Sequence, residues 1–227
     1  MTMKPITVLL AEDHTIVREG FRKMLELEAD IQVVGEAQDG RQAVLLAKKL
    51  CPSVVLMDIA MPLLNGLEAV RQILKETPAT KVLMLSAHSD DAYVNSATES
   101  GAVGFLLKQT SAQDVCRAIR DVHNGRTFFS PSISKRRDRL NLQSPSRAGR
   151  LDKKAAHLTS REMEVLQLIA EGKANKETAS ELGIGMKTVE KHREHLMQKL
   201  DIHDTAGLTR YAISTGVIES SVQLTIV

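Results

Sequence analysis

Residues 6–13 read Ile-Thr-Val-Leu-Leu-Ala-Glu-Asp, and residues 54–58 read Val-Val-Leu-Met-Asp. Each is a short apolar run typical of a buried strand, and each ends in acid: Glu12 and Asp13 in the first, Asp58 in the second. Strands of a parallel sheet can bring such acids to one edge. Because clustered carboxylates raise one another's pKa, these three acids indicate a site for a hard divalent cation, most simply Mg²⁺.

The surrounding sequence repeats this pattern of a short apolar run followed by helical periodicity. We expect strands over 6–10, 31–34, 54–57, 82–85 and 103–107, and helices near 15–28, 39–49, 66–76, 90–100 and 112–124. Five strand–helix repeats predict an α/β domain with a parallel sheet covered on both faces. In the flavodoxin-like order 2-1-3-4-5, the first and third strands flank the point where strand order reverses, and such sheets bind ligands there.

Two more chemical groups, Ser86 and Lys108, end the fourth and fifth predicted strands. Phosphoryl transfer depends mainly on positioning and charge neutralisation, and this set supplies both. Asp58 is the candidate nucleophile, and Asp13, helped by Glu12, would hold the cation. Lys108 would offset the charge of the phosphoryl oxygens, and the Ser86 hydroxyl would hydrogen-bond one of them.

The middle of the chain has a different composition. Residues 131–155 carry eight Lys and Arg against two Asp and Glu, whereas residues 1–130 carry 14 against 16 and residues 156–227 carry eight against ten. The segment 125–155 is rich in Ser, Pro and Arg, which predicts a solvated basic linker. Contact with the phosphates of DNA is the alternative use of its positive charge.

Helical periodicity returns after the linker and predicts an all-α domain of four helices. Thr159, followed three residues later by Glu162, forms a capping box that opens the first helix, and Gly172 closes it. Further helices are expected over 175–182, 186–200 and 205–214. The tight turn Gly-Ile-Gly at 183–185 joins the second helix to the third, which is the helix-turn-helix arrangement.

The helix over 186–200 has two different faces. Val189, His192, Leu196 and Leu200 share one face, which we expect to pack against the other helices, with His192 as a core histidine. Helix-turn-helix proteins read base edges from the exposed side of this helix. The candidate DNA-contacting residues there are Lys187, Thr188, Glu190, Lys191, Glu194 and His195. Lysine can donate a hydrogen bond to guanine, glutamate can accept one from cytosine, and the threonine hydroxyl can donate one to a phosphate.

The charge of this domain affects how it would bind DNA. Residues 156–227 have a net charge of −2, and electrostatic attraction supplies most non-specific affinity for DNA. We therefore expect weak binding by one copy. Useful affinity would come from a homodimer on paired major-groove half-sites about one helical turn apart.

The motifs taken together resemble those of a known family. They are Leu-Ala-Glu12-Asp13-His, Leu-Met-Asp58-Ile-Ala-Met-Pro62, Leu-Ser86-Ala and Gly-Phe-Leu-Leu-Lys108. Residues 4–124 resemble a response-regulator receiver domain. Residues 156–220 resemble the LuxR-type DNA-binding domain, with the helix-turn-helix core at about 173–192 and a tail at 221–227. The chain is thus similar to bacterial two-component regulators of the NarL/FixJ family.

This resemblance implies a cytoplasmic transcription regulator that is switched by phosphorylation. A sensor histidine kinase would supply the phosphoryl group to Asp58, and the protein would dimerise on phosphorylation or on DNA. The backbone carbonyl of Ala60 would join Asp13 and Asp58 on Mg²⁺.

Three residues around the predicted phosphoryl site have more specific expected roles. Phe105 occupies the aromatic switch position, where it would swing inward as Ser86 moves; an ordinary half-buried core phenylalanine is the alternative. Ala60 and His88 lie two residues beyond Asp58 and Ser86, where they would flank the attacking water and set the lifetime of the phosphoryl group.

Two other functions share parts of this pattern. One is a phosphorylation-independent DNA-binding regulator whose receiver domain is a protein-interaction module, although the intact acid–lysine set argues against it. The other is a metal phosphatase, which has a second Asp two residues after the nucleophile as a general acid. Ala60 stands there and has no proton to give. We therefore expect no enzymatic activity beyond self-phosphorylation at Asp58 and its slow hydrolysis.

The remaining features concern location. No apolar run reaches the length of about 18 residues that indicates a membrane span, and we expect no signal peptide. Cys51 and Cys116 are isolated in apolar contexts. This predicts buried, reduced thiols and fits a cytosolic protein.

Overall fold

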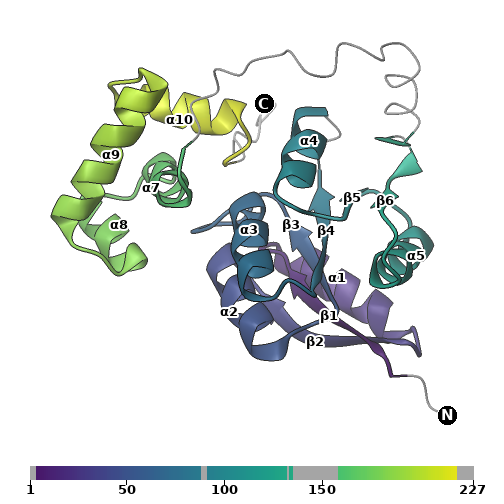
Figure 1. The fold of residues 1–227 in the computed structure, drawn as a ribbon. Coiled ribbons are helices and arrows are strands. Elements are labelled where there is room, and N and C mark those ends of the chain that lie inside the picture. The colour runs from purple at the N-terminus through teal and green to yellow at the C-terminus, as the bar shows by residue number, and fades with distance from the viewer. Residues whose placement is uncertain (1–3, 88–90, 132, 135–157, 219–227) are drawn as a thin grey trace, which may run out of the picture. The chain divides into compact units, whose positions relative to one another are not determined.

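The computed structural model describes residues 4–87, 91–131, 133–134 and 158–218. The chain divides into two compact units. The first contains the described strands together with α1 to α5, and the second contains α7 to α10 (Figure 1). In the described residues, no helix is both long enough and apolar enough to cross a lipid bilayer.

The first unit is built on a parallel sheet. Its strands are β1 (Ile6–Ala11), β2 (Ile31–Ala37), β3 (Val54–Asp58), β4 (Lys81–Ser86), β5 (Gly104–Leu107) and β6 (Phe128–Phe129). The spatial order is β2-β1-β3-β4-β5-β6, so the strand order reverses beside β1, as predicted. The predicted count of five strands was wrong by one. Phe128 and Phe129 pair with Gly104 and Phe105, and a two-residue strand is too short to produce an alternating pattern.

Helices cover both faces of this sheet. They are α1 (Thr15–Glu26), α2 (Gly40–Leu50), α3 (Gly66–Glu76), α4 (Asp91–Glu99) and α5 (Ala112–His123). The chain runs one way across the sheet from β1 to β2 and the other way from β2 to β3. Because crossovers between parallel strands are right-handed, α1 and α2 lie on opposite faces. The core beneath α1 and α5 joins alternate β1 residues such as Val8 and Leu10 to Leu25 and Ile119, and α2 packs beside α3 on the other face (Figure 1).

The two cysteines differ in environment. Cys116 of α5 is buried, as expected, but the prediction of a buried Cys51 was wrong, because its side chain is exposed. Cys51 is the C-cap of α2 and has a left-handed backbone, with φ 44°. Cys51 therefore follows the last residue of α2, and its side chain does not lie on the face of the helix that packs against the sheet.

All the secondary structure described in the second unit is helical. The helices are α7 (Ser160–Ala170), α8 (Asn175–Leu182), α9 (Met186–Leu200) and α10 (Thr205–Ser214). The predicted capping box is present: Glu162 N donates to Thr159 Oγ1 at 3.3 Å, and Thr159 N donates to Glu162 Oε2 at 2.8 Å. Gly183 takes a left-handed φ of 62° after α8, which allows the tight turn into α9.

Candidate functional site

The carboxyl ends of the central strands of the first unit stop at matching depth. Ala11 pairs with Met57, Asp58 with Leu85, and Ser86 with Leu107. The groups that follow each strand therefore meet at one edge of the sheet. Glu12 and Asp58 are 2% and 1% exposed, and Ser86 is also buried.

Lys108 connects the acids of this edge. Its Nζ donates hydrogen bonds to Asp58 Oδ2 at 2.9 Å and to Glu12 Oε1 at 3.1 Å. The backbone N of Lys108 donates to the Ser86 carbonyl at 2.8 Å, which keeps the fourth and fifth strands together beyond the end of β5. The sequence predicted that these four residues share one edge, and their geometry agrees.

Burial and charge perturb both members of the central ion pair. Burial raises the pKa of Asp58 to about 7; the negative charge of Glu12 adds to this rise and Lys108 opposes it. Burial alone would lower the pKa of Lys108, but the charges of Asp58 and Glu12 outweigh it and raise the pKa. The neighbouring carboxylates therefore favour the charged form of Lys108, whereas burial and the charge of Glu12 disfavour the ionised form of Asp58.

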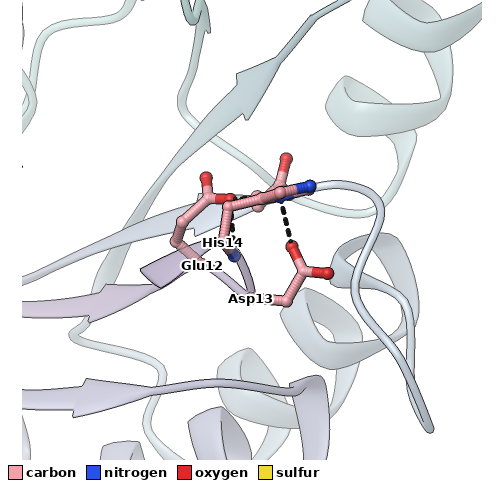
Figure 2. Close-up of side chains that lie close together, drawn as sticks. Glu12, Asp13 and His14 are labelled. Carbon is pink, nitrogen blue, oxygen red and sulfur yellow. Dashed lines mark hydrogen bonds and ion pairs between the residues drawn. The ribbon is translucent and has the colours of Figure 1, made fainter. Parts of the chain in front are cut away.

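The turn after β1 brings a histidine to the acids (Figure 2). His14 Nδ1 lies 3.0 Å from Glu12 Oε1 and 2.8 Å from Asp13 Oδ1. Its hydrogen bond with Glu12, with the charge of Asp13 adding to the effect, raises the pKa of His14. Sequence reasoning gave His14 no role, although its place beside two acids was a signal for one.

The donor atoms at this edge fit a divalent cation. Ligand atoms of Glu12, Asp13, His14 and Asp58 all lie within 4.8 Å of one another. Two buried oxygens, Glu12 Oε2 and Asp13 Oδ1, accept no hydrogen bond from the described residues. Each does lie near a basic nitrogen: Glu12 Oε2 is 3.0 Å from Lys108 Nζ, and Asp13 Oδ1 is 2.8 Å from His14 Nδ1. Carboxylate oxygens are the ligands that Mg²⁺ prefers, so the chemistry of this donor set matches the predicted ion.

The other predicted residues of this site have different surroundings. Phe105 is 0% exposed, so it is more deeply buried than the half-buried phenylalanine we considered. It pairs with Met84 on one side and Phe129 on the other. Ala60 is partly exposed after β3. His88 lies outside the described residues, and the roles of all three remain predictions.

Sequence reasoning did not identify Gly66, the first residue of α3. A Cβ atom there would lie 2.0 Å from the carbonyl oxygen of Asp58. The backbone N of Gly66 also donates to the Ile59 carbonyl at 2.8 Å. Only glycine lets α3 begin this close to Asp58. Its position at a helix start was visible in the sequence, but the close approach was not.

In the second unit, α9 has the two faces that its sequence predicted. Val189 and Leu196 are buried, and His192 and Leu200 are half-buried. The exposed residues are Lys187, Thr188, Glu190, Lys191, Glu194 and His195. All six predicted DNA-contacting residues are thus accessible, and their individual contacts remain predictions.

A residue that sequence reasoning missed holds α9 in place. Arg193 donates to Thr205 Oγ1 at 2.7 Å and to Asn175 Oδ1 at 3.3 Å. These bonds connect α9 to the starts of α10 and α8. Arg193 is therefore occupied in fixing the orientation of the helix that carries the exposed polar face.

Family models match both units. One described as "Response regulator receiver domain" matches residues 8–120, and one described as "Bacterial regulatory proteins, luxR family" matches residues 156–212. The matches leave out the basic segment between them, as the composition of that segment suggested.

Individual relatives are similar over nearly the whole chain. The transcriptional regulatory protein MctR of Rhizobium johnstonii is 38% identical over 219 residues, covering 96% of this chain and 98% of MctR. The response regulator protein VraR of Staphylococcus saprophyticus is 38% identical over 216 residues, covering 95% and 100%. A solved structure of two RcsB dimers bound to two parallel DNAs is 27% identical, with a TM-score of 0.56, and covers 93% of this chain and 99% of that one.

Proposed function

Because this chain belongs to the NarL/FixJ-type response regulators, and is a two-component transcription regulator with a receiver domain and a LuxR-type DNA-binding domain, we propose that Asp58 is its phosphoacceptor. The observation that carries this proposal is the buried Asp58 carboxylate, 2.9 Å from Lys108 Nζ, at an edge that also holds Glu12 and Asp13.

In the proposed reaction, an ionised Asp58 oxygen attacks the phosphorus of a phosphohistidine on a sensor histidine kinase. The phosphorus–nitrogen bond breaks, the histidine nitrogen takes up a proton, and an acyl phosphate forms on Asp58. Lys108 lies where it can compensate the added negative charge, since its Nζ already contacts Asp58 Oδ2 at 2.9 Å. Ser86, buried at the end of β4, would donate its hydroxyl to a phosphoryl oxygen.

Mg²⁺ would be held by Asp13, Asp58 and the Ala60 carbonyl, with Glu12 assisting. When bound, the ion supplies positive charge that stabilises the phosphoryl oxygens during transfer. Lys108 Nζ also donates a hydrogen bond to Glu12 Oε1 at 3.1 Å, and this bond directs the ammonium toward Asp58. Because burial and the charge of Glu12 disfavour ionisation of Asp58, a nearby positive charge would favour its ionised, nucleophilic form.

The chain's own activity would be limited to self-phosphorylation and slow hydrolysis. Ala60 stands two residues after Asp58, where a general acid would be needed for turnover of external phosphate esters, and its methyl group cannot donate a proton. The phosphoryl charge would then bias the receiver domain between two states and change dimer contacts.

The output would be DNA binding by a homodimer through the exposed face of α9. RcsB, a relative by structure, is described as dimers bound to DNA, which supports the same assembly here. The domain limits 4–124 and 156–220, the basic linker and a cytoplasmic location belong to this proposal as well.

Phosphorylation can be tested with a small phosphodonor, phosphoramidate, in the presence of MgCl₂. Intact mass would report one added phosphoryl group on the wild type and none on Asp58→Asn. Asp114→Asn serves as a matched control because this partly exposed acid lies in the first turn of α5, away from the acidic edge of the sheet. An operator selected from random DNA would then be titrated with phosphorylated and unphosphorylated protein, with fluorescence anisotropy as the readout.

We expect phosphorylation to raise operator affinity in the wild type and the control, and to have no effect in Asp58→Asn. Equal affinity with and without the phosphoryl group would instead favour a phosphorylation-independent regulator. A phosphoryl group that still attaches to Asp58→Asn would disprove the assignment of the acceptor.

A further inference from the structure

A buried arginine side chain contacts the backbone of the acidic turn that follows β1. Arg18, in α1, is 5% exposed, and arginine is seldom buried to this extent without partners. Its Nη1 donates to the Glu12 carbonyl at 2.7 Å and, with a longer bond of 3.4 Å, to the Asp13 carbonyl. Its Nε lies 3.3 Å from Glu36 Oε2. The guanidinium therefore connects the backbone of the two acids to a carboxylate on β2.

The two carbonyls have a special place in the chain. The Glu12 carbonyl belongs to the peptide unit before Asp13, and the Asp13 carbonyl belongs to the unit after it. Holding both units restricts the backbone dihedrals of Asp13 and thereby the direction of its side chain. The carboxylate that Arg18 contacts has a fixed backbone position, because Glu36 lies in β2, in register with Leu10 of β1.

Arg22, one helical turn further along α1, provides a direct comparison. Its Nη1 lies 2.7 Å from Glu36 Oε1, so it shares a partner with Arg18. Its Nε lies 2.8 Å from Glu26 Oε1, and its side chain is 52% exposed. Arg22 thus has charge, length and the Glu36 contact in common with Arg18, but its partners are carboxylates on the helix and strand surface.

We propose that Arg18 is a positioning residue for the acidic site: it holds the Glu12–Asp13 backbone in the orientation that a divalent cation requires, without touching the cation or the phosphoryl group. This inference rests on the proposed function, because it assumes that Asp13 binds the ion. Residues that orient metal ligands from outside typically change metal affinity by about ten- to hundredfold when replaced.

The test uses the full chain with Arg18→Met, Arg18→Lys and Arg22→Met. Methionine keeps much of the apolar stem and removes the donors, whereas lysine keeps one cationic donor. Isothermal titration would measure the Kd for Mg²⁺. The phosphorylation rate with phosphoramidate, measured against MgCl₂ concentration, would give the half-saturating Mg²⁺ and the rate at saturation.

We expect Arg18→Met to raise both the Kd and the half-saturating Mg²⁺ at least about tenfold, with a rate at saturating Mg²⁺ within about twofold of wild type. Arg18→Lys should recover part of the affinity, and Arg22→Met should match the wild type. Weaker Mg²⁺ affinity combined with an unchanged rate at saturation would identify a positioning role. A residue that only stabilises the fold would instead change the unfolding midpoint and leave the Mg²⁺ affinity of the folded protein unchanged.

An Arg18→Met variant that binds Mg²⁺ with the wild-type Kd would overturn the inference. If this variant does not fold, Arg18→Lys and Glu36→Gln decide instead, since the second loosens the guanidinium from β2 without altering the turn; unchanged Kd values in both would also overturn it. Wild-type protein that binds no Mg²⁺ would overturn this inference and the proposed function together, whereas normal wild-type binding with an unaffected Arg18→Met overturns the inference alone.

Discussion

Replacing Gly66 by alanine should damage the phosphoryl site through the backbone of Asp58. The new Cβ would lie 2.0 Å from the Asp58 carbonyl oxygen, and real Cβ contacts are essentially never shorter than 3.0 Å. The first residue of α3 and the end of β3 must therefore separate by about 1.0 Å, the difference between these two distances. Because the obstructing atom is backbone, no side-chain rotation relieves the contact.

We expect Gly66→Ala to lower the free energy of unfolding by about 1–3 kcal/mol, the usual cost of overpacking, and to slow phosphorylation because the Asp58 carboxylate moves with its peptide. Gly20→Ala is the matched control. Gly20 lies inside α1 with no atom within 4 Å of an added Cβ, so alanine there should stabilise by about 0.8–1.0 kcal/mol through helix propensity. The two substitutions are chemically identical and should act in opposite directions.

Hydrogen–deuterium exchange with increasing urea can assign these effects to segments, which suits a chain of two units. Exchange of peptides from β3 and α3 should begin at lower urea in Gly66→Ala, and exchange of α1 at higher urea in Gly20→Ala. Phosphorylation by phosphoramidate provides the functional readout. A Gly66→Ala protein with wild-type urea dependence and a wild-type phosphorylation rate would refute the argument from steric contact.

Three further changes test the ion pairs and the reading helix. Lys108→Met leaves two buried carboxylates without their cation, so unfolding free energy should fall by about 3 kcal/mol and recover partly with MgCl₂, as urea titrations would report. Burial raises the pKa of Glu162, but hydrogen bonds from Lys199 and Thr159 outweigh it and lower the pKa. The stability that these interactions contribute should be fully present above the unfolded pKa of about 4.3. It should be lost as the pH falls through the lower folded pKa. Acid titration of melting temperature should show a smaller loss in Lys199→Ala. Lys191→Ala should weaken operator binding by about 1–3 kcal/mol and relax preference at one base, which anisotropy with substituted operators would detect.

Much of the fold followed from local pattern. The helix over 186–200 and the turn at Gly183 were predictable because helical periodicity and a glycine end-signal agree there. The Thr159–Glu162 capping box was readable as a spacing of three residues. In each case the determining contacts lie within one helical turn, so neighbouring residues carry the information.

Other features depend on distant parts of the chain. The strand β6 exists because Phe128 and Phe129 pair with β5, and two residues leave no periodic trace. The exposure of Cys51 follows from its left-handed C-cap conformation. In the sequence, Arg18 looks like any polar residue of an amphipathic helix. Its contacts with the Glu12 and Asp13 carbonyls become visible only in the folded structure.

The sequence by itself determined the chemistry of this protein: acids, a hydroxyl and a lysine at successive strand ends, then a helix-turn-helix with polar residues on one face of its second helix. Tertiary structure alone decided which of these groups meet. Lys108 contacts Glu12 and Asp58 from 96 and 50 residues away, Gly66 approaches Asp58 through the start of α3, and Arg18 holds the turn from beneath. The physical reason is that residue types and spacings specify strands and helices locally, whereas distances between their ends depend on strand order, register and packing.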